Sequence, residues 1–191
     1  MQIDRRLNLV LTVERADGST LYVHSVPVRR EVFSRYYMVI AQTFARIYAG
    51  GLGAIAAPRI AAMMLRDVAA EAGTLDGPTG VENGLFNEIK RTTTVIAPGA
   101  NGWETLPYAD AVSRKLLDED DAAEVENAVA FFIVSSAMLK RKMLPELLAG
   151  MQRLWGGLFT SSSCTEYAAG LPMSIGAGST GATATASSTP S

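Results

Sequence analysis

The sequence predicts a mainly α-helical α+β fold, in which an N-terminal β-hairpin precedes a bundle of five or six helices and a disordered C-terminal tail. Near the N-terminus, apolar residues alternate with polar ones on both sides of a turn, which is typical of paired strands. Later segments repeat apolar residues every three or four positions, as amphipathic helices do. We expect one domain over residues 1–171 and a flexible low-complexity tail over 172–191, because the tail has too little apolar surface to offset its ordering entropy.

The predicted hairpin covers two strand-like segments, of which the first is Leu7–Val13 and the second Leu21–Val28. The intervening Ala16–Ser19 contains Asp-Gly, a strong turn signal because glycine adopts positive φ without steric cost. Pro27 lacks an N–H and indicates that the second strand is an edge strand or ends there. A hairpin is marginal alone, so we expect helices to cover one of its faces.

Two helices are predicted next. Arg30–Ala49 has an apolar and aromatic stripe at helical spacing, and Gly50-Gly51 terminates it. The second helix is expected over Pro58–Ala72, because proline suits the first helical position and Gly73 suits the position after the last.

The middle of the chain is less regular. Val81–Thr94 is predicted as a shorter helix, although the β-branched run Thr92–Ile96 is equally compatible with an extended strand. Ala97–Pro107 is predicted as a loop with a turn at Asn101-Gly102, and Tyr108–Leu117 as a short helix.

The segment Asp118–Lys142 is predicted as the central helix of the core. It begins with four acids and ends with three bases, which complements the helix dipole, and Asp118 suits the N-cap. Its uncharged stretch, Asn127–Leu139, is apolar nearly all round, which indicates burial, and is shorter than the roughly 20 residues that span a bilayer. A further helix is expected from Pro145 to Gly156.

Composition favours a protein of the cell interior. A net charge of −2 provides no general attraction for nucleic acid or an anionic membrane. A single cysteine rules out an internal disulfide, which fits a reducing compartment. The N-terminus lacks the apolar run and cleavage site of a signal peptide. We therefore expect no membrane and no nucleic acid among the partners.

No motif predicts catalysis, a cofactor or a metal. His24 has no Gly-x-Ser-x-Gly element to accompany it, and Cys164 has no base nearby in the sequence. Gly51–Ala56 matches Gly-x-Gly-x-x-Ala, but the segment before it has helical periodicity instead of the strand that dinucleotide binding requires. Asp118–Asp121 lacks the ligand spacing of a calcium loop. We expect a non-enzyme.

Exposed aromatic and apolar side chains are therefore the candidate sites. Aromatic residues anchor interfaces, although they also anchor cores. The candidate partner-binding residues are Tyr36, Tyr48, Trp103, Trp155, Leu158 and Phe159.

The order of these segments resembles the tail assembly chaperones of long-tailed bacteriophages. The resemblance covers about residues 7–171. The stretches that carry it are VHSVPVRREVFSRYYMVIAQTFARIYAGGLG, APRIAAMMLRDVA, VENGLFNEI, NGWETLP, EVENAVAFFIVSSAM, LWGG and SCTEYAAGLP. The low-complexity end is also similar to that family, in which a longer product is often made by translational frameshifting.

The resemblance implies a non-catalytic chaperone that binds the tape measure protein in the host cytoplasm, recruits major tail tube subunits and is absent from the mature virion. Self-association is also compatible with it. The alternative from the same setting is a structural tail or neck component. A third possibility is a small enzyme or nucleotide-binding protein built on Gly51–Ala56. A thermal shift on adding nucleotides would support it, and we expect none.

Overall fold

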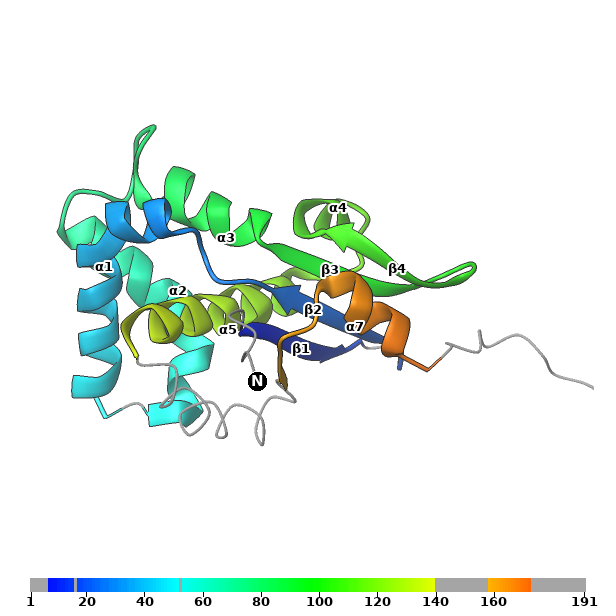
Figure 1. Cartoon of the computed structure of the whole chain (residues 1–191). Coiled ribbons are helices and arrows are strands. Elements are labelled where there is room, and N and C mark those ends of the chain that lie inside the picture. Colours follow the sequence, from blue (N-terminus) through cyan, green and yellow to red (C-terminus); the bar gives the residue numbers. More distant parts are fainter. Residues whose placement is uncertain (1–6, 16, 52, 140–157, 173–191) are drawn as a thin grey trace, which may run out of the picture.

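The computed structural model describes residues 7–15, 17–51, 53–139 and 158–172 (Figure 1). The side chains of residues 53–55 and 159 are excluded from the description. The predicted tail, the bases of Lys140–Lys142 and the helix expected from Pro145 therefore lie outside the described residues, except for Pro172. The fold is α+β, as predicted, but its strands are spread along the chain.

Five strands form one antiparallel sheet in the order β4-β3-β2-β1-β5. The predicted hairpin is confirmed as β1 (Asn8–Glu14) and β2 (Thr20–Ser25). The second strand ends before Pro27, as its sequence indicates. The other strands are β3 (Thr93–Gly99), β4 (Gly102–Pro107) and β5 (Leu158–Thr160).

The predicted loop over Ala97–Pro107 is wrong, because most of it belongs to β3 and β4. Proline is uncommon inside strands, so Pro98 and Pro107 favour a loop in this segment. Pro98 lies beyond the part of β3 that pairs with β2, which ends at Ile96, so the missing N–H costs no bond there. A turn is found there, but one residue earlier than predicted: Ala100 and Asn101 form it, and Gly102, with a φ of 118°, begins β4 opposite Gly99.

Three long helices pack together beside the sheet. They are α1 (Arg30–Ala49), α2 (Gly53–Glu71) and α5 (Glu119–Met138). The bounds of α1 are as predicted, whereas α2 begins five residues before the predicted Pro58, which lies inside the helix. Gly73 follows α2 with a φ of 66°, and the Thr74 N–H donates to the Ala69 carbonyl at 2.8 Å, which closes the helix end.

The shorter helices differ more from their predictions. The segment predicted as one helix over 81–94 is a π-helix, η1 (Glu82–Phe86), and then α3 (Asn87–Arg91), after which β3 begins. The helix predicted over 108–117 is α4 (Tyr108–Ser113) and is four residues shorter. Near the C-terminus of the described chain, α7 (Cys164–Gly170) starts with a capping box between Ser163 and Glu166.

The helix α5 is the centre of the core, as predicted. The Asp118 side chain accepts the Asp121 N–H at 2.8 Å and so caps its first turn. Every residue from Ala128 to Ser135 is buried. Figure 1 shows α5 crossing one face of the sheet, where it contacts β1, with α7 over the opposite face. The fold is therefore a group of helices packed on a five-stranded sheet, of which the predicted hairpin forms two strands.

Strand alternation separates the two faces of the sheet. Leu9, Leu11 and Val23 point into the helical core. Val10 and His24, which pair across the two strands, lie on the opposite face and are also buried. His24 there contacts the Ser162 carbonyl. This second face of the sheet is buried because α7 packs on it, against β3 and β4.

Candidate functional site

The outer side of α1 carries two of the exposed large apolar side chains among the described residues. Met38 is 63% exposed and Tyr37 is 45% exposed. The Phe33 ring meets the Tyr37 ring edge-on, with centroids 5.7 Å apart. Phe33 itself is half-buried and packs against the core, in which Tyr36 and Ile40 are buried.

Two hollows lie beside this helix. The first, of about 490 Å³, lies between α1 and the connection that follows α2, and Arg35, Met38 and Thr79 line it. The second, of about 450 Å³, lies between α1 and the end of α2, and Gln42 and Val68 line it. Met38 and Gln42 are one helical turn apart, so the hollows follow one another along α1. We call the two together the α1 groove.

Charge at the α1 groove is uneven. Arg46 of α1 and Glu71 of α2 pair across the second hollow, and the hydrogen bonds from Arg46 lower the pKa of the Glu71 carboxyl. Arg35 lines the first hollow and has no ion-pair partner among the described residues. The groove therefore offers an apolar side chain, Met38, next to an unpaired cation.

A hollow separate from the α1 groove lies on the sheet face that α7 covers, between α7 and the ends of β1, β2 and β3. Its volume is about 620 Å³. We call it the sheet pocket, and the residues that line it include Asn8, His24, Arg91, Thr94, Cys164 and Glu166.

The Ser162 carbonyl contacts two polar side chains that line this pocket. It accepts the Asn8 Nδ2–H at 3.0 Å, and His24 Nε2 lies 3.1 Å from it. The contact assigns the proton of a neutral His24 to Nε2. The single histidine and the single cysteine, 140 positions apart in sequence, thus line one pocket, which no local sequence pattern predicts. Only the sheet register and the β5 pairing bring them together.

The pair is not set up for nucleophilic chemistry. Burial lowers the pKa of His24, although its bond to Ser162 opposes that effect. Burial also raises the pKa of Cys164, with a hydrogen bond from Thr94 acting the other way. Both groups are therefore neutral near pH 7, whereas catalytic cysteines need a stabilised thiolate.

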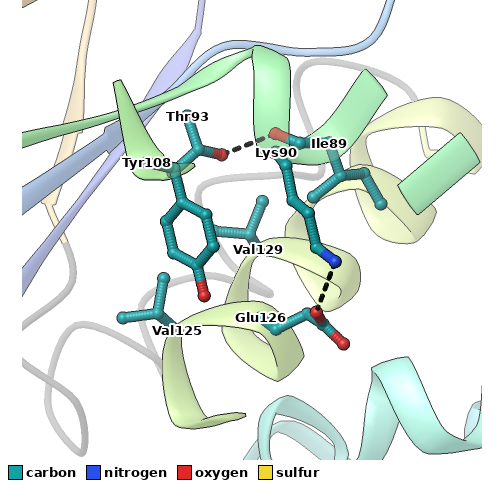
Figure 2. Close-up of a pocket in the computed structure, with 7 residues that line it drawn as sticks. All are labelled: Ile89, Lys90, Thr93, Tyr108, Val125, Glu126 and Val129. Atoms are coloured by element: carbon teal, nitrogen blue, oxygen red, sulfur yellow. Dashed lines mark hydrogen bonds and ion pairs between the residues drawn. The ribbon is translucent and has the colours of Figure 1, made fainter. Parts of the chain in front are cut away.

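A third, much smaller gap borders Tyr108 (Figure 2). Its volume of about 10 Å³ holds at most one water molecule. Lys90 Nζ lies 3.8 Å from Glu126, and burial, followed by the Glu126 charge, raises the pKa of Tyr108 to about 12. The Tyr108 hydroxyl donates to the Ala122 carbonyl at 3.2 Å. This is a packing gap between α3, α4 and α5 and not a ligand site.

The predicted partner-binding residues have different positions. Tyr36 is buried, and its hydroxyl donates to the Thr79 carbonyl at 3.0 Å, so it is not a surface anchor. Tyr48 is half-buried against the Phe44 ring. Trp103 is half-buried, and its Nε1–H donates to the Pro172 carbonyl at 2.8 Å, which ties β4 to the chain after α7.

Of the remaining three, Leu158 on β5 is 39% exposed. Trp155 and the Phe159 side chain lie outside the described residues. Tyr37 and Met38 were not among the predicted partner-binding residues, because the helical spacing of Arg30–Ala49 places Tyr37 in the apolar stripe with Phe33 and Ile40. In the structure Tyr36 is buried and Tyr37 is 45% exposed.

The described residues contain no group of three or more His, Cys, Asp or Glu side chains placed to hold a metal ion. None of their helices combines the length and apolar character needed to cross a membrane. The Gly51–Ala56 match to a dinucleotide fingerprint follows α1 instead of a strand.

The chain was also compared with known proteins. No protein-family model, no curated protein and no solved structure matched it.

Proposed function

We propose that this chain is a non-catalytic tail assembly chaperone that binds an amphipathic helix of the tape measure protein in the α1 groove. The observation that carries the proposal is the exposed Met38, which borders the groove on the outer side of α1. The resemblance in sequence texture supplies the identity of the partner.

The groove suits a helical partner for physical reasons. Its two hollows extend along α1 from Arg35 to Arg46, about three helical turns. An amphipathic helix presents apolar side chains at that spacing. Methionine adapts to varied partners because it is unbranched and polarizable. Burying the exposed part of Met38 contributes about 1–2 kcal/mol.

Charge gives the partner helix an orientation. Arg35 is unpaired among the described residues, so an acidic residue at one end of the bound helix satisfies it. A long tape measure protein with apolar helical faces aggregates unless such faces are covered. In the proposed role the chaperone covers them until tube subunits assemble.

The proposal also includes a second binding partner and a cellular location. The major tail tube protein is the second partner, self-association is compatible with the role, and the chain acts in the host cytoplasm and is absent from the mature virion. These parts rest on the resemblance.

Co-expression with the proposed partner, a phage tape measure protein, tests the proposal. We expect the tape measure protein to stay soluble and to copurify with the wild type, and to precipitate with Met38→Asp. Met63→Asp is the matched control, because Met63 is 53% exposed on α2 and lines neither hollow. Equal solubility with and without the wild-type chain contradicts the proposal.

A second experiment separates the chaperone from a structural tail or neck component. Mass spectrometry of purified virions is expected to recover the tube and tape measure proteins without this chain. Recovery of the chain in stoichiometric amounts contradicts the chaperone role and favours a virion component.

A further inference from the structure

One edge of the sheet has no neighbouring strand among the described residues. The strand order β4-β3-β2-β1-β5 makes β4 the outermost strand on its side (Figure 1). Along it, Glu104, Thr105 and Pro107 are exposed and Trp103 is half-buried. A strand edge of this kind presents backbone N–H and C=O groups that can pair with another strand. The residues that face the edge decide which strand fits it.

The register of the β3–β4 hairpin shows which residues of β4 face the edge. Gly99 and Gly102 flank the two-residue turn and therefore exchange backbone hydrogen bonds, and such pairs alternate along an antiparallel ladder. Trp103, Thr105 and Pro107 fall on the intervening positions, so their backbone groups point away from β3. Pro107 has no N–H and presents only its C=O. No backbone hydrogen bond from the described residues reaches the outward groups of Trp103 and Thr105.

We propose that this edge binds the same edge of a second copy of the chain, antiparallel and about a two-fold axis at Thr105. There the Thr105 N–H donates to the C=O of Thr105 of the partner subunit, and the reverse bond forms by symmetry. The Trp103 N–H donates to the C=O of Pro107 of the partner subunit, again in both directions. The two sheets thereby become one continuous sheet. This surface is separate from the α1 groove, and it does not depend on the proposed chaperone role.

The side chains of β4 select this register. Glu104 lies opposite Leu106 of the partner subunit, and its charge is balanced by Arg114, whose Nη1 is 3.1 Å from Glu104 Oε1. A two-fold axis at Glu104 would place two like charges directly opposite each other, which destabilises a strand pair. With the axis at Thr105, two threonines face each other, a pairing that stabilises strands. The half-buried Trp103 then gains apolar cover from Pro107 of the partner subunit.

A second copy suits this edge better than a flexible peptide does. Its β4 is already held as a strand by β3, so pairing does not have to order a free chain, which costs about 1–2 kcal/mol per residue. Two-fold pairing also brings Pro107, which can only accept, opposite Trp103, which supplies an N–H. The edge is therefore complementary to itself.

Sedimentation velocity of the full chain over a range of concentrations measures self-association. The wild type is expected to rise from 20.3 kDa toward about twice that mass. Thr105→Pro removes the central N–H without removing a bond to β3, and is expected to weaken self-association at least about tenfold, since both copies lose a bond. Thr105→Val keeps the N–H and is the matched control, expected to associate within about twofold of the wild type. Equal association of all three proteins overturns the proposal.

Hydrogen exchange of the wild type gives a readout that stands even if Thr105→Pro does not fold. The amides of Trp103 and Thr105 are expected to become protected as the concentration rises. The Glu104 amide, which pairs with Ala97 inside the monomer, is expected to be protected at every concentration. Self-association without new protection of Trp103 and Thr105 overturns the proposal. A chain that stays monomeric at every concentration also overturns it, and leaves the edge to an extended strand of another protein.

Discussion

The Tyr36 hydroxyl of α1 occupies the space next to Gly84 of η1 that any side chain at residue 84 would need. A Cβ built on Gly84 would lie 2.6 Å from Tyr36 Cζ and would overlap the hydroxyl oxygen. That hydroxyl also donates to the carbonyls of Thr79, at 3.0 Å, and Gly80, at 3.3 Å. The contact fixes the π-helix against α1 and places the connection that forms one wall of the α1 groove.

Gly84→Ala is therefore expected to destabilise the protein by about 2–3 kcal/mol, because the well-packed interior must shift to accept one methyl group. Urea denaturation measures the change. Tyr36→Phe in the same chain removes the overlapping oxygen, so the double variant is expected to lose less than the sum of the single losses. Gly170→Ala is the control, since nothing lies within 4 Å of a Cβ there. Additive losses contradict the contact.

Glu88 links the start of α1 to α3. Its side chain is buried, and it accepts hydrogen bonds from Arg91 and from Arg29, whose Nε lies 2.9 Å away. These bonds, those from Arg91 above all, lower the pKa of the carboxyl from 4.5 to about 2. A lowered carboxyl pKa stabilises the folded protein fully above the unfolded value of 4.5, and this stability disappears as the pH falls toward 2.

Glu88→Gln is expected to cost on the order of 2 kcal/mol at pH 6, a figure reduced because both arginines are largely exposed and screened. Between pH 5 and about 2 the variant loses less stability than the wild type. Urea midpoints at several pH values measure both effects. Glu104→Gln removes the exposed pair with Arg114 and is expected to change stability by less than about 0.5 kcal/mol. Parallel pH profiles for wild type and Glu88→Gln refute the linkage.

Phe132 tests the central place of α5. Its side chain has no exposure and belongs to the helical core. Phe132→Ala is expected to cost about 3–5 kcal/mol, through lost burial and the cavity that remains. Phe132→Asp places an unpaired charge there and is expected to unfold the chain, which circular dichroism detects. Glu124→Asp, on the exposed side of α5, is the control. A folded and stable Phe132→Asp protein shows that the core lies elsewhere.

Local patterns predicted the elements whose neighbours are close in sequence. The β1–β2 hairpin, α1 with its glycine end and the Asp118 cap of α5 all follow from periodicity and capping residues. The sheet beyond the hairpin does not. β3 pairs with β2, which lies about 70 positions earlier in the chain. Pro98 and Pro107 also made β3 and β4 hard to predict, because proline normally interrupts strands.

The candidate sites were harder to predict for the same reason. Tyr36 and Tyr37 are adjacent tyrosines with equal propensities, and only the packing of α1 on the core decides which is exposed. Asn8, His24 and Cys164 share a pocket because β5 and α7 return to the first strand after about 150 residues. No local pattern contains that information.

The most direct test of the central claim is site-specific crosslinking at the α1 groove. A photoreactive residue replaces Met38, or Met63 as the matched exposed control, in cells that also produce the proposed partner, a phage tape measure protein. Mass spectrometry then identifies the crosslinked partner before tail assembly is complete. The proposed role predicts crosslinks from position 38 to helical segments of the tape measure protein and none from position 63. An absence of tape measure crosslinks at position 38, or equal yields from the two positions, contradicts it.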